Sequence, residues 1–340
     1  LTRKTETIDG VPYTYKYTYD DNNRVTSLGF PSSLQLDYTY GAIGQLDHIA
    51  YNGISLFRTG QRDGGGRYTK YKLGSLPATT RSYDHGLPTS IETEGISHLE
   101  LKWDPTSANL LSRWDRDHAV HEAFEYDHLN RLRSSTVSTT DEQGQVVSPV
   151  SHHSFEYDGD IGHTKGNLLV KSDIGQLSYV ANKAASALHI SYPVPPDQPP
   201  YVISLETQTI SYTSHHKAKS VTETVNGVSH DLTYFYGTDH QRRTSTRREN
   251  GQVKEVRTYV GAYEKQVSDG VTRELHHVYG GDGLCAILVR QGGSLRINLV
   301  LKDHLGSITK VVEAAGPSWY VAAEQNFDAW GRRRKPTTWE

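Results

Sequence analysis

The sequence predicts an all-β fold in which short antiparallel hairpins repeat along the chain. Every second residue from Tyr13 to Tyr19 is a tyrosine, and a period of two is typical of a strand, not of a helix. An aromatic residue followed by Asp then recurs many times, each time ahead of residues that favour a turn. We therefore expect a β-ribbon that curls into one continuous sheet around an inner cavity.

The stretch from Phe124 to Leu132 contains the repeating unit in its most complete form. Phe124 and Tyr126 fall on one face of a short strand, which predicts an aromatic inner face. Asp127 can bond to its own backbone two residues on, and Asn130 tolerates a left-handed backbone conformation. These residues predict a tight turn, after which a second strand returns from Leu132.

The spacing of the units indicates how they are organised. The aromatic positions fall 21, 43, 20, 23 and 31 residues apart, and a further unit follows in the last third of the chain: Tyr19, Tyr40, Tyr83, Trp103, Tyr126, Tyr157 and, later, Tyr236. The interval of 43 predicts two units with one degenerate turn near Gly64–Gly66. A hairpin-sized repeat must stack on its neighbours to bury its apolar face.

The composition limits the classes of function. The chain has 340 residues, 22 tyrosines and a net charge of −3, so no general attraction to nucleic acid is expected. Its single cysteine, Cys285, forms no internal disulfide, and the apolar residues around it predict a buried side chain. No apolar run approaches the ~18 residues of a membrane-spanning helix, which predicts no membrane span.

Three segments are predicted. Residues 1–191 form repeat hairpins, residues 192–200 a proline-rich surface loop, and residues 201–340 further repeats. Within the last segment, strands are expected from Leu295 to Leu301 and from Trp319 to Phe327.

Residue types typical of catalysis occur close together at Asp303, His304 and Ser307. A catalytic triad needs its three side chains to converge, which three residues within one short turn rarely do. We expect a hairpin turn there, with Asp303 bonded to backbone amides and Gly306 in a left-handed conformation. No catalytic, cofactor-binding or metal-binding residue is assigned.

Histidine pairs and arginine clusters have simpler interpretations than a metal or nucleic-acid site. Neighbouring residues on a strand face opposite sides, so a pair such as His152–His153 cannot chelate one ion alone. The other pairs are His215–His216 and His276–His277. Arg242, Arg243, Arg247 and Arg248 and the run from Arg332 to Lys335 lack interleaved aromatic residues, so no nucleic-acid partner is expected.

Two motifs carry a resemblance to a known family. The aromatic–Asp units resemble YD repeats, and two later motifs at 301–307 and 327–334 resemble the Rhs-associated core. The core positions, interpreted as structural, are Asp303, His304, Leu305, Gly306, Ser307, Phe327, Asp328, Trp330, Gly331 and Arg332. In Rhs proteins and the C components of insecticidal toxin complexes, this resemblance implies a β-ribbon that spirals into a hollow shell around a toxic C-terminal domain.

The resemblance implies a non-enzymatic encapsulating segment of a secreted toxin, extracellular or delivered by a toxin complex. Its partners would be its own C-terminal toxin, absent here, and a delivery component or companion shell subunit. In the family, an aspartate-containing self-cleavage motif follows the core, and the sequence stops at Glu340 before it. Two alternatives remain: a teneurin-like shell that binds a receptor or glycan, and a carbohydrate-active enzyme with paired carboxylates.

Overall fold

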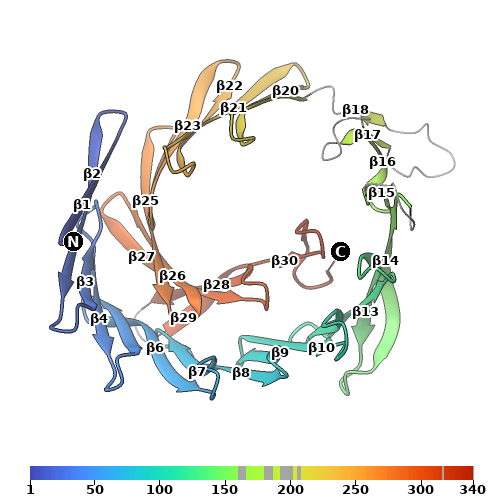
Figure 1. Cartoon of the computed structure of the whole chain (residues 1–340), viewed down its shortest axis with the longest axis horizontal. Coiled ribbons are helices and arrows are strands. Elements are labelled where there is room, and N and C mark those ends of the chain that lie inside the picture. The colour runs from blue at the N-terminus through green and yellow to red at the C-terminus, as the bar shows by residue number, and fades with distance from the viewer. Residues whose placement is uncertain (160–165, 180–186, 192–201, 205–207, 316–317, 340) are drawn as a thin grey trace. The chain divides into compact units, whose positions relative to one another are not determined.

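The computed structural model describes residues 1–339 apart from 160–165, 180–186, 192–201, 205–207 and 316–317. All the regular elements within these residues are strands, so the predicted all-β class is confirmed (Figure 1). None of the described residues belongs to a helix that could cross a membrane. The predicted proline-rich loop at 192–200 lies outside the described residues, and the three predicted segments stay a prediction.

Two large antiparallel sheets contain almost all of these strands. The first sheet has 18 strands: β1 (Arg3–Ile8), β2 (Val11–Tyr19), β3 (Val25–Gly29), β4 (Gln35–Tyr40), β5 (Leu46–Tyr51), β6 (Ile54–Arg62), β7 (Tyr68–Leu73), β8 (Ala78–Asp84), β9 (Leu87–Thr93), β10 (Ser97–Trp103), β11 (Leu110–Asp115), β12 (Val120–Tyr126), β13 (Leu132–Thr140), β14 (Val146–Tyr157), β15 (Leu168–Lys171), β16 (Gly175–Tyr179), β17 (Ala187–Ser191) and β18 (Val202–Ser204).

The second sheet has 11 strands: β19 (Gln208–Tyr212), β20 (Ala218–Val225), β21 (Val228–Tyr236), β22 (Arg242–Glu249), β23 (Gln252–Val260), β24 (Tyr263–Ser268), β25 (Val271–Gly280), β26 (Gly283–Gln291), β27 (Ser294–Lys302), β28 (Ile308–Ala315) and β29 (Ser318–Glu324). A short pair, β30 (Asn326–Phe327) and β31 (Arg333–Arg334), follows. The sequence predicts one continuous sheet, whereas the described residues form two large sheets. Residues 205–207, between β18 and β19, lie outside the described residues.

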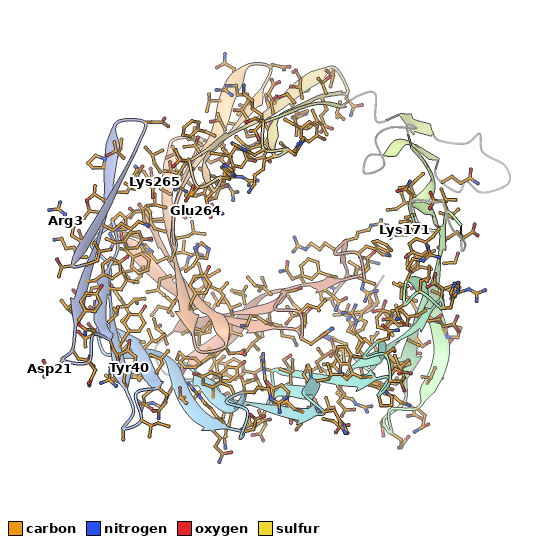
Figure 2. The ribbon with its side chains drawn as sticks, in the orientation of Figure 1. Arg3, Asp21, Tyr40, Lys171, Glu264 and Lys265 are labelled. Atoms are coloured by element: carbon orange, nitrogen blue, oxygen red, sulfur yellow. The ribbon has the colours of Figure 1, made fainter. Side chains whose placement is uncertain are left out.

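Strands that follow one another in the sequence lie side by side in the sheet. β1 pairs with β2, β2 with β3 and β12 with β13, all antiparallel. Many hairpins carry a register shift beside their turn, as at Tyr19 and Tyr126. Such a bulge places an extra residue in one strand and increases the local twist. Side chains consequently stand on both faces of a twisted ribbon (Figure 2).

The described chain divides into two compact units. The first unit contains residues 1–81, 91–95 and 209–324, and the second contains residues 82–90, 96–208 and 325–340. In the first unit, strands of the two large sheets pack against each other. The Tyr15 hydroxyl donates to the carbonyl oxygen of Val260 at 2.6 Å, and the rings of Phe30 and His276 lie 5.0 Å apart.

Two adjacent glycines let the sheets of the first unit approach closely. A Cβ on Gly280 would lie 2.7 Å from the ring of Phe57, and one on Gly281 would lie 1.8 Å from the hydroxyl of Tyr68. Real Cβ atoms do not approach other heavy atoms so closely. The turn between β25 and β26 therefore needs glycine where it meets the aromatic side chains of β6 and β7.

In the second unit the last residues pack against the hairpins. The side chain of Trp339 is 1% exposed and contacts Val120 of β12 and Val137 of β13, which are equally well buried. These three residues form a small apolar core with Leu99 of β10 at its edge. We refer to residues 325–339 as the docked segment.

The strand predicted around the alternating tyrosines is correct, the strand β1 before it was not predicted, and the prediction near the end of the chain is wrong. β2 spans Val11–Tyr19, as the alternating tyrosines predict. The single strand expected from Trp319 to Phe327 is instead interrupted after Glu324. Glu324 pairs with Lys310 in the first unit, whereas Phe327 pairs with Arg333 in the second, so the chain leaves one unit for the other at this point.

Candidate functional site

The repeat turn is closed by a single aspartate. Oδ1 of Asp127 accepts hydrogen bonds from the backbone N–H groups of Leu129 and Arg131, both at 2.9 Å. Its Oδ2 accepts from Nε of Arg131 at 2.6 Å, and Asn130 has a φ of 60°. The predicted roles of Asp127 and Asn130 are thus confirmed. These bonds hold the pKa of Asp127 below its usual value, although burial opposes them.

The same turn recurs at both ends of the chain. In each case the carboxylate accepts from the backbone N–H groups two and four residues later, and a left-handed residue lies between them. The aspartates are Asp20, Asp63, Asp127, Asp303 and Asp328. An arginine four residues later binds the carboxylate at Asp20, Asp63 and Asp127.

The tyrosine of each unit joins it to an earlier unit. The hydroxyl of Tyr126 donates to the carbonyl oxygen of Leu110 at 3.0 Å, and that of Tyr157 donates to Leu132 at 2.9 Å. The guanidinium of Arg131 lies 4.6 Å from the centre of the Tyr157 ring, a cation–π distance. The Tyr157 side chain therefore contacts the residues at the previous turn through both its ring and its hydroxyl.

Most other predicted repeat aromatics make the same kind of contact. Tyr19, Tyr40 and Tyr236 donate to the carbonyl oxygens of Leu1, Val25 and Ala218. Trp103 donates to the carbonyl oxygen of Pro88 through its indole nitrogen at 2.6 Å. Tyr83 is half-buried at the end of β8. Tyr19 is the most open of these, at 37% exposed.

The structure also shows the unit missing from the sequence pattern. Asp63 begins the same turn, with Gly66 in the left-handed position, and Arg62 stands where the other units carry an aromatic residue. The guanidinium of Arg62 lies 4.3 Å from the centre of the Tyr68 ring. The predicted degenerate unit between Tyr40 and Tyr83 is confirmed.

The residues at 303–307 form a turn of the same type. Asp303 accepts from the backbone N–H groups of Leu305 and Ser307 at 2.9 and 2.8 Å, and Gly306 has a φ of 87°. Leu305 points outward, at 77% exposed. His304 lies in the same turn. The geometry is that of the expected hairpin turn.

The remaining candidate clusters each have structural contacts. No three side chains among the described His, Cys, Asp and Glu residues gather as a metal site. Cys285 is buried, and burial raises the pKa of its thiol to about 12. Arg243 pairs with Glu6 and Asp239. Arg242 lies 4.1 Å from the centre of the Tyr234 ring, so aromatic residues do interleave with this arginine cluster, contrary to the sequence argument.

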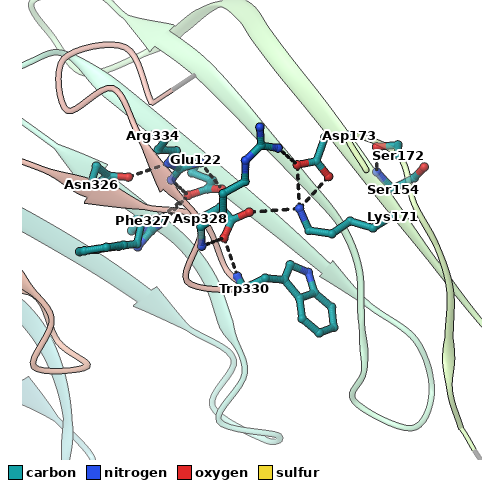
Figure 3. A network of polar contacts seen from close by, with 12 residues as sticks. Glu122, Ser154, Lys171, Ser172, Asp173, Asn326, Phe327, Asp328, Trp330 and Arg334 are labelled. Carbon is teal, nitrogen blue, oxygen red and sulfur yellow. Dashed lines mark hydrogen bonds and ion pairs between the residues drawn. The ribbon is translucent and has the colours of Figure 1, made fainter. Parts of the chain in front are cut away.

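The docked segment is held by a buried ion triad. Glu122 on β12 is fully buried and accepts from Arg113 on β11 at 2.7 Å and from Arg334 on β31 at 2.5 Å (Figure 3). Burial alone would raise the pKa of Glu122, but the two guanidinium groups outweigh it, and the pKa lies below its usual value. Arg113 also donates to the carbonyl oxygen of Phe327 at 2.7 Å.

A second ion network joins the turn of the docked segment to β15. Lys171 donates to Asp173 at 2.6 Å and to Asp328 at 3.2 Å, and Arg332 donates to Asp173 at 2.6 Å (Figure 3). The ring of Trp330 lies 5.5 Å from that of Phe155 on β14. The predicted core residues Phe327, Asp328, Trp330 and Arg332 are thus brought together on the hairpins β11–β15, and Gly331, with a φ of 81°, completes their turn.

Sequence reasoning missed the partners of this segment. Arg113 and Glu122 lie opposite each other on β11 and β12, Lys171 lies on β15, and none of them belongs to a motif that links it to the last residues. One signal was present, because Glu122 alternates with Val120 and Phe124 and should share the apolar side of its strand with them. A buried charge needs a partner, so Glu122 could have been expected to bind one.

The comparisons with known proteins give a fold and no family. No protein-family model matches the chain, and no curated protein matches its sequence. The crystal structure of TcdB2–TccC3 is similar over 97% of this chain and 20% of that one, with a TM-score of 0.70 and 12% identity. A Photorhabdus luminescens Tc holotoxin pore carrying a TccC3 mutation is similar over 95% of this chain and 18% of that one, with a TM-score of 0.69 and 14% identity. The chain therefore has the fold of a region of these toxin-complex proteins and spans about one fifth of their length.

Proposed function

We propose that this chain is a wall segment of a hollow, Rhs-type β-shell that encloses a toxic C-terminal domain until delivery. In this proposal the segment acts as a container and not as an enzyme. Its partners are the enclosed domain and the neighbouring parts of the shell. The protein is secreted or delivered by a toxin complex.

The observation that carries the proposal is the fold likeness to TcdB2–TccC3 along 97% of the chain. Such a likeness at 12% identity concerns the backbone, which is the part that a container wall depends on.

The repeat contacts support a wall that resists opening. Neighbouring hairpins are joined by backbone ladders and also by a tyrosine hydroxyl on the previous turn, as at Tyr126 and Tyr157. Most pairings join strands that follow one another in the sequence, so the sheets can extend hairpin by hairpin. A polypeptide held behind such a sheet would be shielded from proteases and from its targets.

A pair of glycine variants tests containment. In the complete protein that carries this segment, Gly281→Ala places a methyl group 1.8 Å from the Tyr68 hydroxyl and should loosen the wall. Gly64→Ala is the matched control, because its Cβ meets no atom within 4 Å. We expect the C-terminal domain to resist protease in the wild type and in Gly64→Ala, and to be cleaved faster in Gly281→Ala.

Equal and rapid cleavage of the C-terminal domain in all three proteins would contradict containment. Resistance that persists after the wall is unfolded would also contradict it, because the domain would then protect itself. The alternative of receptor or glycan recognition stays a prediction from the sequence. It would be favoured if the wild type bound cell surfaces while its C-terminal region stayed open to protease.

A further inference from the structure

A pocket of about 390 Å³ lies beside the docked segment in the second unit. Its wall combines side chains of β14, the residue Asp173 after β15, and the docked segment. They are Ser151, His153, Asp173, Asp328, Arg332, Arg333, Arg334 and Trp339. All of these residues belong to one compact unit. Neither the repeat contacts nor the proposed shell uses this pocket.

Positive charge exceeds negative charge around the pocket. Five cationic side chains, Arg113, Lys171, Arg332, Arg333 and Arg334, accompany three carboxylates, Glu122, Asp173 and Asp328. Lys171 and Arg332 are balanced by the two aspartates. Arg333 forms no ion pair with a described residue, so its charge is open to a ligand.

The excess of positive charge is least screened by water at the buried triad of Arg113, Glu122 and Arg334. The side chains of Arg113 and Arg334 are each 6% exposed, and both bind the single carboxylate of Glu122. Two buried cations that share one anion leave a net positive charge away from water. The Trp339 ring, 4.9 Å from the Arg113 guanidinium and 5.0 Å from that of Arg334, offsets this charge only in part, so a further anion would be favourable. Arg334 lines the pocket, so an anion there would lie next to this charge.

Two lining side chains also carry polar groups without a partner. The Ser151 hydroxyl and the Trp339 indole nitrogen are covered from solvent and make no hydrogen bond. A buried donor without an acceptor is uncommon in folded proteins. The indole N–H can only donate, and a hydroxyl can donate, so both would be satisfied by an acceptor.

We propose that this pocket binds a small oxyanion, a phosphate or a carboxylate, whose charge balances the buried Arg113–Glu122–Arg334 triad. Arg333 and Arg334 supply positive charge, and Ser151 and Trp339 supply neutral donors. A metal cation would meet three arginines in the wall and is disfavoured by the same charges. The inference is independent of the proposed shell function.

Titration with inorganic phosphate tests the proposal. Binding to the whole chain is followed by calorimetry at pH 7 and constant ionic strength, with glutamate in a second arm as the carboxylate. Saturable binding of either anion supports the site. The anion with the higher affinity shows whether the pocket prefers a phosphate or a carboxylate. Absence of saturable binding by both overturns it.

Three variants locate the binding. Ser151→Ala and Trp339→Phe each remove one donor, and each should weaken binding roughly tenfold, as expected for a lost hydrogen bond to a charged group. Arg333→Gln should weaken it by roughly threefold, because its side chain is exposed. Arg3→Gln is the control, since Arg3 is exposed on β1 in the other unit (Figure 2) and should leave the affinity unchanged.

A second readout does not depend on affinity. Burial lowers the pKa of His153, and Lys171 and Arg334 act in the same direction. An anion in the pocket should raise that pKa, which nitrogen-15 NMR of the histidine rings can follow, with His153→Gln to assign the signal. Equal phosphate affinity in the wild type and in Ser151→Ala and Arg333→Gln would show an adventitious ion only and would overturn the proposal.

Discussion

In repeat turns that begin with aspartate, such as that at Asp127, one carboxylate makes several contacts. Asp127 satisfies two backbone N–H groups and fixes Arg131, whose guanidinium then lies on the ring of Tyr157 in the next unit. The Tyr157 hydroxyl in turn bonds to the carbonyl oxygen of Leu132. The aromatic–Asp pair thus couples turn geometry to the stacking of neighbouring hairpins.

Variants of Tyr126 separate the contribution of its hydroxyl group to stability from that of its ring. Tyr126→Phe loses only the hydrogen bond to Leu110 and should reduce the free energy of unfolding by about 1 kcal/mol. Tyr126→Ala also loses the half-buried ring and should lower it by roughly 2–3 kcal/mol. His128→Ala, exposed in the same turn, should stay within about 0.5 kcal/mol. Urea unfolding measures all three, and equal effects would refute the role of the tyrosine.

His276 predicts a dependence of stability on pH. The ring is fully buried between the sheets of the first unit, donates through Nδ1 to the carbonyl oxygen of Leu288 at 2.9 Å and lies 2.6 Å from the Ser32 hydroxyl through Nε2. Burial lowers its pKa, although the bond to Leu288 and the charge of Glu274 oppose this effect. The unfolded chain, with a histidine pKa of about 6.5, therefore binds more protons than the folded chain once the pH falls to that value.

The free energy of unfolding should thus be highest above about pH 6.5 and should decrease as the pH falls through the lowered pKa of the folded state. His48, His121 and His153 have lowered pKa values and act in the same direction. His276→Gln should show a smaller decrease between about pH 7 and pH 5 than the wild type. Urea unfolding at several pH values across this range measures the decrease. If the free energy of unfolding depends on pH equally in the variant and the wild type, His276 does not contribute.

At the scale of elements, the docked segment depends on the triad around Glu122. Glu122→Gln removes the carboxylate that Arg113 and Arg334 share, and should lower the free energy of unfolding by about 3 kcal/mol. Glu142→Gln, in an exposed turn, is the matched control. Trypsin should cut the variant near Arg334 faster than the control. Equal cleavage rates would show that the triad does not hold the segment.

Local patterns allowed the strands and turns to be predicted, because their causes lie within a few residues. The alternation of tyrosines from Tyr13 to Tyr19 predicted the strand β2. The backbone preferences of Asp127 and Asn130 predicted the turn between β12 and β13. The docking of the last residues could not be predicted in this way. Arg334 and Glu122 lie 212 residues apart, and their pairing depends on how many hairpins stack between them.

At the scale of the whole molecule, the backbone follows a region of the TcdB2–TccC3 structure over almost its entire length. The aromatic–Asp units and the two later motifs, through their resemblance to a known family, predicted an all-β fold of this kind, although no family model or curated protein matches the sequence. At 12% identity the likeness concerns the backbone fold alone.

The central claim is that the sheet encloses a polypeptide. Electron cryomicroscopy of the complete protein tests it most directly. We predict density for additional polypeptide enclosed on one side of this sheet and absent from a variant that lacks the C-terminal domain. Density for that domain as a separate folded body outside the sheet would contradict the account.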